Sequence, residues 1–215
     1  MARSAHTRSR VKPWMVGAFL VIIVVVAAAF STTVVSIEQA TADAAGGFDP
    51  AEYAADRYES EIAPAIEQDA HDLATLITDL AGGADESEFG NTSGSSSSFS
   101  FPVTFTGVAG TAVGSILPVT VPGVPADVTV QVQIGPALNG TALRDVTGTV
   151  SFNEFTNQLE YQQVATELNN QVRDSVLTGL DPASLTGKTI TVTGAFTRVN
   201  PTLVSVVPVA FEVQP

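Results

Sequence analysis

Residues 134–160 read IGPALNGTALRDVTGTVSFNEFTNQLE, and this stretch joins a strand pattern to a helix pattern. Apolar residues alternate with polar ones over 128–134 and again over 146–152, counting Gly148 with the apolar set. A period of two puts neighbouring side chains on opposite faces of a strand. The connection holds the turn dipeptides Gly135-Pro136 and Asn139-Gly140, so the sequence predicts a hairpin with an elaborated tip.

A helix pattern begins where the second predicted strand ends. Asn157 and Glu160 have the spacing of a capping box, and Gly179 is suited to end the helix. An apolar stripe recurs between them at helical spacing: Leu159, Val164, Leu168, Val172 and Val176. The predicted order from residue 128 is therefore strand, strand, helix.

Polar residues crowd the predicted hairpin tip and the start of the helix: Asn139, Thr141, Arg144, Asp145, Asn153, Asn157 and Gln158. The stretch contains no nucleophile beside a base, no metal-ligand spacing and no phosphate-binding loop. We interpret it as a candidate surface for a hydroxyl-rich ligand or a protein partner, because amides and a single arginine suit both. The alternative is local structure, in which Arg144 pairs with Asp145 while Asn153 and Asn157 cap turns.

Further strand patterns occupy 99–106, 116–121, 190–196 and 204–213, the last interrupted by Pro208, which indicates an edge or a bulge. With 116–121 left as spare strand material, the order is β-β-β-α-β-β, which is typical of an OB-type Greek-key barrel. We therefore predict an α+β fold with an OB-like, five- or six-stranded antiparallel barrel and a helix between its third and fourth strands. A barrel face of this kind can bind oligosaccharides. A split α+β sandwich is the competing fold.

Acidic helical sequence precedes the barrel. Asp49-Pro50 caps and opens a helix, and Gly82-Gly83 ends the apolar pattern. Pro64 lies inside the pattern, so we expect two helices or one kinked helix. Twelve acidic residues lie between Asp49 and Glu88, which indicates a solvated helix face.

These acidic residues do not predict a metal or cofactor. Their spacing does not match a calcium-binding loop of the EF-hand type. His71 follows Glu67 by four residues, but two ligands are too few for a metal site, so we expect a surface histidine.

The first 36 residues predict a membrane anchor. Residues 14–36 are almost continuously apolar and uncharged, and Arg3, Arg8, Arg10 and Lys12 precede them. This predicts a single-pass protein of the cell membrane, with a cytoplasmic N-terminus and an extracytoplasmic C-terminal domain. A signal peptide cleaved near Ala40-Thr41-Ala42 is the alternative.

Charge and cysteine content exclude several function classes. Four of the nine basic residues precede the apolar run, so the rest of the chain carries five against 22 acidic residues, a net charge of about −17. Such a surface repels phosphate backbones and excludes nucleic-acid binding. The absence of cysteine excludes disulfides, thiolate chemistry and a lipid-modified cysteine.

These patterns divide the chain into five parts. We predict a cytoplasmic N-terminus over 1–13, the anchor over 14–36, and a stalk with acidic helices over 37–83. A Ser/Gly-rich linker follows over 84–98, and the OB-like domain over 99–215.

Three segments resemble a bacterial family of predicted periplasmic lipoproteins or membrane-anchored proteins, domain of unknown function 2291 (DUF2291). They are TVVS (33–36), FDPAEYAADRYESEIAPAIEQDAHDLATLI (48–77) and IGPALNGTALRDVTGTVSFNEFTNQLEYQQVATELN (134–169). The most specific part is GTALRD followed by the SFNEFTNQLEY run. The resemblance departs from the family in its lack of a lipobox cysteine and in the Ser-rich linker. It implies an accessory role beside sugar ABC transporter components, with no chemistry named.

We therefore expect an extracytoplasmic binding or assembly module associated with sugar uptake, with a carbohydrate or a transporter component as its partner. An enzyme is the alternative, because Glu154 and Glu160 could supply paired carboxylates for hydrolysis. We do not expect catalysis, since the common hydrolase constellations are absent from the sequence. A purely structural tether is the third reading.

Overall fold

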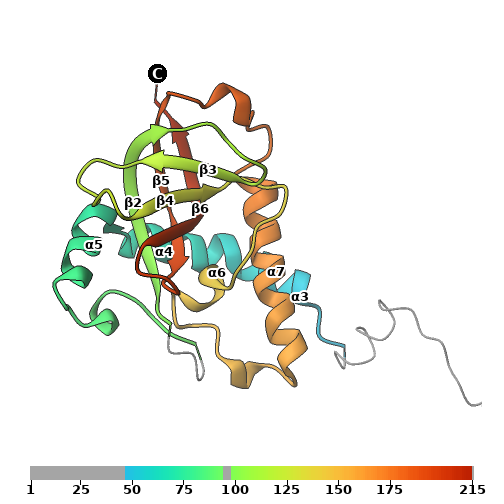
Figure 1. Cartoon of the computed structure of the whole chain (residues 1–215). Coiled ribbons are helices and arrows are strands. Elements are labelled where there is room, and N and C mark those ends of the chain that lie inside the picture. The colour runs from blue at the N-terminus through green and yellow to red at the C-terminus, as the bar shows by residue number, and fades with distance from the viewer. Residues whose placement is uncertain (1–46, 94–97, 215) are drawn as a thin grey trace, which may run out of the picture. The chain divides into compact units, whose positions relative to one another are not determined.

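The computed structural model describes residues 47–93 and 98–214, which belong to one compact unit running from Ala45 to Pro215 (Figure 1). The predicted anchor at 14–36 lies outside the described residues. Among the helices that the structure does describe, none is both long enough and apolar enough to cross a membrane.

Five strands form a closed barrel. They are β2 (Ser100–Ala109), β3 (Ile116–Thr120), β4 (Thr129–Gln133), β5 (Thr189–Thr197) and β6 (Leu203–Val213). The order around the ring is β2-β3-β4-β6-β5, and pairing of β2 with β5 closes it. A two-residue strand, β1 (His71–Asp72), adds to β2 in parallel. The predicted OB-like barrel is confirmed.

One pairing in the barrel is parallel, so the prediction of an antiparallel barrel is wrong in this detail. β4 and β6 run parallel, with Val130 opposite Val204 and Val132 opposite Val206. The reason is topological. Strand direction alternates around an all-antiparallel ring, which requires an even number of strands, so a ring of five contains at least one parallel pair.

Residues 146–152 do not form the predicted strand, and the predicted hairpin does not exist. The chain instead forms the short helix α6 (Ala142–Asp145) and a 3-10 turn, Phe152–Glu154. Gly148 between them has a φ of 68°, which a strand does not accommodate. β4 already has β3 and β6 as its two neighbours, so the barrel offers no place for another strand there. The β-β-β-α-β-β order holds because 116–121, left as spare material, supplies β3.

The predicted irregularity at Pro208 is a β-bulge. The β5–β6 register shifts between Thr193 and Gly194, with Gly194 opposite Pro208 and Thr193 opposite Ala210. A Cβ on Gly194 would lie 2.2 Å from the carbonyl oxygen of Val207. Glycine is therefore required where the two backbones approach most closely.

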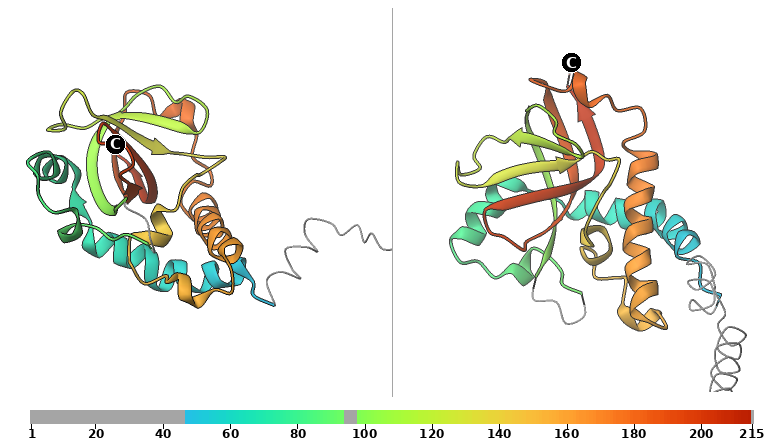
Figure 2. Two further views of the ribbon diagram at one scale, coloured as in Figure 1. Left: turned by 60° about the horizontal axis from the view of Figure 1, so that its bottom comes forward. Right: turned by 45° about the vertical axis from the view of Figure 1, so that its right-hand side comes forward.

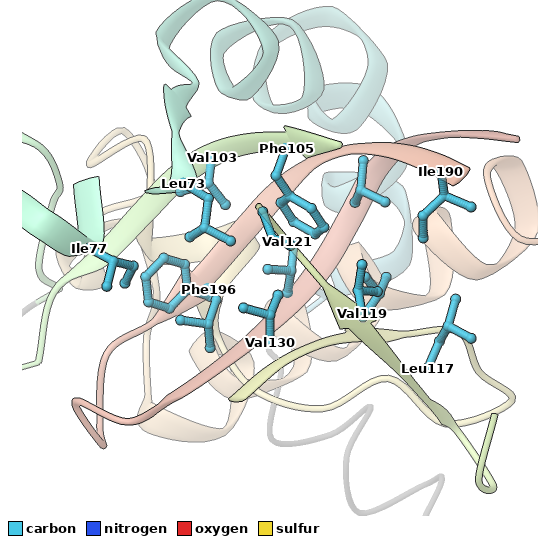
Figure 3. Packing of buried hydrophobic residues seen from close by; sticks show 14 of the residues in the cluster. Leu73, Ile77, Val103, Phe105, Leu117, Val119, Val121, Val130, Ile190 and Phe196 are labelled. Carbon is cyan, nitrogen blue, oxygen red and sulfur yellow. The ribbon is translucent and has the colours of Figure 1, made fainter. Parts of the chain in front are cut away.

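The first hydrophobic cluster, called the barrel core, joins the inward side chains of the strands to helix α5 (Leu73–Ala81). Figure 3 shows Leu73 and Ile77 of α5 packed beside Phe196 and Val103. Phe101 and Phe196 are fully buried with their rings 5.5 Å apart. This apolar interior follows from the alternating pattern of the strands.

The regular α-helix of the acidic segment is interrupted twice. The first interruption is the one that the sequence predicted from Pro64. Helix α3 (Pro50–Arg57) continues through a π-helical turn, Tyr58–Ile62, into α4 (Ala63–Asp69). The wide turn precedes Pro64, whose ring would clash with the carbonyl four residues earlier in a regular helix. The second break follows α4, so Glu67 and His71 do not share a helix.

The second hydrophobic cluster, called the cap core, lies between these helices and the barrel. It contains side chains of α3, α4, α6 and α7 (Gln158–Ser175), with Ala195, Val207 and Val209 of the barrel. Val164, Leu168 and Val172 of the predicted α7 stripe are fully buried, whereas Leu159 is exposed.

The structure describes residues 84–93 and 98 of the predicted linker, and the first of these ranges contains a 3-10 turn, Glu86–Glu88. Asn91 then pairs with Ser100 at the start of β2 through backbone hydrogen bonds of 3.0 and 2.7 Å. This part of the segment is therefore packed beside the barrel. The domain boundaries themselves stay a prediction.

Candidate functional site

A pocket of about 710 Å³ opens between α6, the Phe152–Glu154 turn and the first turns of α7. Figure 2 shows α6 (yellow) between the barrel and α7 (orange). The pocket is lined by Thr92, Ser93, Thr141, Arg144, Asp145, Gly148, Val150, Ser151, Phe152, Asn153, Gln158 and Tyr161. None of these residues belongs to a barrel strand.

The structure brings together five of the seven predicted site residues: Thr141, Arg144, Asp145, Asn153 and Gln158. The other two lie outside the pocket lining. The backbone of Asn139 is held by the side chain of Gln133 through bonds of 2.7 and 3.0 Å. Asn157 caps α7, because its Oδ1 accepts from the backbone N–H groups of Leu159 at 2.9 Å and Glu160 at 3.0 Å.

Arg144 and Asp145 form a buried ion pair in the pocket wall. Arg144 donates from Nε to Asp145 Oδ1 at 2.7 Å and from Nη2 to Oδ2 at 3.1 Å. Thr141 donates its hydroxyl to Asp145 Oδ2 at 2.6 Å. Only 6% of Arg144 and 7% of Asp145 is exposed. The local pairing considered as the alternative is thus present, and it fixes both groups where they line the pocket.

Tyr161 supports this pair and was missed by the sequence analysis. The Arg144 guanidinium lies 3.6 Å from the centroid of its ring and donates from Nη1 to its backbone carbonyl at 3.0 Å. The Tyr161 hydroxyl lies 3.4 Å from Asp145 Oδ1 and contacts Ser93 Oγ. Burial raises the pKa of this hydroxyl above its ordinary value. The signal was its spacing, three residues after Gln158 on one helix face.

Phe152 gives the pocket an apolar side. It is 39% exposed, and its ring packs edge-to-face on Tyr161 with centroids 5.4 Å apart. Phe155 also packs on Tyr161, with ring centroids 5.3 Å apart. A half-exposed aromatic ring beside hydroxyl and amide groups can contact the apolar face of a polar ligand.

The pocket lining is close to neutral in a strongly acidic protein. Arg144 and Asp145 are its charged residues, and they pair with each other, whereas the whole chain has a formal charge of −13. Across 47–93 and 98–214, no three histidine, aspartate or glutamate side chains come together as metal ligands. The arrangement therefore suits an uncharged polar ligand.

The Phe152–Glu154 turn is tied to α3 by a charged network. Glu154 accepts through Oε2 from Tyr53 at 2.9 Å and from Arg57 at 3.2 Å. Its Oε1 accepts from the backbone N–H of Ser151 at 2.7 Å. Burial, followed by the bond to Glu154, raises the pKa of Tyr53 to about 12. The hydrogen bonds from Arg57 hold the pKa of Glu61 below its usual value.

Comparison with known sequences identifies the family. The family described as predicted periplasmic lipoprotein, DUF2291, matches residues 20–212. The chain belongs to the DUF2291 family. Membership places it among membrane-associated, extracytoplasmic proteins, although the sequence contains no cysteine for lipid attachment. No curated protein matches the chain.

Comparison with solved structures supports the fold of this DUF2291 protein. An OB-fold protein from Thermotoga maritima is similar over 78% of this chain and 99% of its own, with a TM-score of 0.63 and 20% identity. At this identity the likeness shows the fold alone.

The carboxylate pair of the enzyme alternative does not line the pocket of this DUF2291 protein. Glu160 is 1% exposed and accepts from Thr156 N at 2.8 Å and from Asn157 Nδ2 at 3.0 Å. Glu154 is held by Tyr53, Arg57 and the backbone of Ser151. Both carboxylates thus stabilise the chain around the pocket.

Proposed function

We propose that this DUF2291 protein is an extracytoplasmic binding module. It binds a hydroxyl-rich, uncharged ligand, such as a carbohydrate, in the pocket beside α6. In this proposal residues 14–36 anchor the chain in the cell membrane as a single pass with a cytoplasmic N-terminus. The protein acts by binding and carries out no catalysis.

The observation that carries the proposal is the composition of the pocket. Its volume of about 710 Å³ lies within the usual range for small-molecule sites. The lining combines hydroxyls of Thr92, Ser93 and Ser151 with the amides of Asn153 and Gln158. Hydroxyls and amides both donate and accept, so they can pair with the hydroxyl groups of a sugar in either sense.

The ion pair gives this pocket a rigid polar wall. The Arg144 guanidinium is held by Asp145, by a backbone carbonyl and by the ring of Tyr161. A donor that is already fixed loses little side-chain entropy when a ligand binds. The ring of Phe152 then supplies the apolar contact that C–H groups of a sugar ring require.

The ligand can be tested with the full-length protein in detergent, by titration calorimetry with glucose, galactose, mannose and xylose. At least one sugar is expected to bind, and Phe152→Ala and Asn153→Ala are expected to weaken it tenfold or more. Val199→Ala removes an exposed apolar side chain outside the pocket and serves as the matched control. No heat of binding and no thermal shift with any sugar would contradict the proposal.

A role in sugar uptake would place the module beside sugar ABC transporter components, and a structural tether would do the same without a ligand. Purification of the tagged protein from native membranes, followed by identification of bound permeases, tests this association. A permease that is retained equally by the wild type and by Phe152→Ala favours the tether, whereas retention that depends on sugar favours the binding module.

A further inference from the structure

A second pocket, of about 500 Å³, lies next to the first along the chain. It is lined by the end of α4, the start of β1 and the 87–91 segment, together with Pro102 and Val146; among its residues are Asp69, His71, Glu88, Phe89 and Asn91. Its aromatic element is Phe89, which packs edge-to-face on His71 with ring centroids 5.4 Å apart. This pocket shares with the first one a mixture of polar groups and one aromatic contact.

Two chain segments contribute residues to both pockets. Ser87 to Asn91 line the second pocket, and Thr92 and Ser93 line the first. On the facing segment, Val146 lines the second pocket and Gly148 lines the first. Residues that are neighbours in sequence thus line the two pockets, which places the pockets next to each other.

One contact divides the pockets. Asn91 donates from Nδ2 to the carbonyl oxygen of Val146 at 2.7 Å. A Cβ on Gly148 would lie 3.1 Å from the Asn91 side chain, and its φ of 68° favours glycine. Asn91 and Gly148 are both exposed, so the division lies at the surface, where a long ligand can cross it.

We propose that the two pockets are adjacent subsites of one groove that binds an oligosaccharide of two or more units across the Asn91–Val146 contact. The inference rests on the proposed function, and it names the ligand as a chain of sugars. One unit contacts Phe152 in the first subsite, and the next contacts Phe89 in the second. The carboxylates of Asp69 and Glu88 accept hydrogen bonds from hydroxyl groups of the second unit.

The test is titration calorimetry on the full-length protein with glucose, maltose, maltotriose, cellobiose and cellotriose. Binding is expected to tighten at least tenfold from glucose to a trisaccharide. Glu88→Trp fills the second subsite and should abolish this gain while glucose binding stays unchanged. Glu212→Trp, at an exposed position outside both pockets, is the control and should behave as the wild type.

The variant Glu88→Ala tests the same position without the added bulk of tryptophan. It should reduce the gain in affinity from glucose to a trisaccharide about threefold or more. Equal affinity for glucose and the trisaccharides, or an equal loss for all sugars in Glu88→Trp, overturns the groove and leaves the proposed function intact. A wild-type protein that binds none of these sugars overturns the groove, and it overturns the proposed function as well when galactose, mannose and xylose also give no heat of binding.

Discussion

The barrel core and the cap core both bury apolar side chains, but they differ in whether buried charged side chains lie beside them. The barrel core is closed by strands and α5 and is filled by side chains such as Phe101, Phe196 and Leu76. The buried charged residues of the described chain, Arg144, Asp145 and Glu160, instead lie on α6 and α7 beside the cap core. We therefore expect the barrel core to contribute most of the stability and the cap to contribute the proposed binding site.

The difference between the two cores explains why the proposed ligand pocket lies beside the cap core and not inside the barrel core. A close-packed apolar interior has little space for a ligand, and a change of one methylene group there is felt. The cap instead holds a desolvated ion pair, which is costly to bury and contributes geometry more than stability. Four predictions test the comparison.

The largest effect is expected in the barrel core. Phe196→Ala removes a fully buried ring that packs on Phe101, and we expect the free energy of unfolding to fall by about 4 kcal/mol. Urea denaturation followed by circular dichroism measures it. Val199→Ala, at an 81% exposed position, is the control and should change little. A loss below about 1 kcal/mol would show that the barrel is not the stable part.

The next effect is expected at the ion pair of the cap. Arg144→Met leaves the buried Asp145 carboxylate without its partner, and we expect a loss of about 3 kcal/mol in the same measurement. The double variant Arg144→Met/Asp145→Leu should lose less, because no unpaired charge remains. If the double variant is as unstable as the single one, the pair contributes stability of its own and the contrast between the two cores fails.

A smaller effect is expected at the start of α7. Asn157→Ala removes the side-chain oxygen that accepts from two backbone N–H groups, which should cost about 1 kcal/mol. Asn153→Ala is the matched control in the neighbouring turn, because its side chain is not the cap of that turn. Equal stability of the two variants would mean that α7 is held by the cap core alone.

The last prediction concerns pH and reports on the cap alone. The three tyrosines of the sequence, Tyr53, Tyr58 and Tyr161, lie on α3, the π-helical turn and α7. Burial is the main cause that raises the pKa of each, to about 12 for Tyr53, above the ordinary value of 10.0. The folded state therefore keeps protons that the unfolded state loses above pH 10.

The free energy of unfolding should accordingly be unaffected by these groups below pH 10 and should fall as the pH rises from 10 toward 12. Tyrosinate absorbance of the native protein should rise only above pH 10, whereas in urea it should rise near 10. Native ionisation of all three rings at the ordinary pKa would mean that the cap opens while the barrel stays folded.

The barrel could be predicted because its residues follow one rule. Each of the five strands shows alternating burial over at least part of its length, and Pro208 with Gly194 marks where the ladder between β5 and β6 is irregular. The same rule failed at 146–152, where the alternation of Val146, Val150 and Phe152 imitates a strand. Gly148 with a positive φ breaks that segment, and a closed ring has no free position for it.

The sequence predicted which residues line the pocket better than it predicted the contacts that hold them there. Five of seven residues line the pocket because α6 and the Phe152–Glu154 turn are close in sequence. The contact of Ser93 with Tyr161 and the bond from Arg57 to Glu154 join segments that are far apart in the sequence. No local sequence pattern indicates these contacts. Tertiary contacts of this kind depend on how the helices pack on the barrel.

The closed ring has a consequence for assembly. Within the described residues, each of the five strands has partners on both sides over part of its length, which limits the backbone open to a strand from another chain. The edge of β2 opposite β5 carries β3 at Val108 and Ala109 and β1 at Val103 and Thr104. We therefore expect a partner protein or a second copy to attach mainly through side chains and not by β-augmentation, so that the specificity of such a complex can change without a change in the strands.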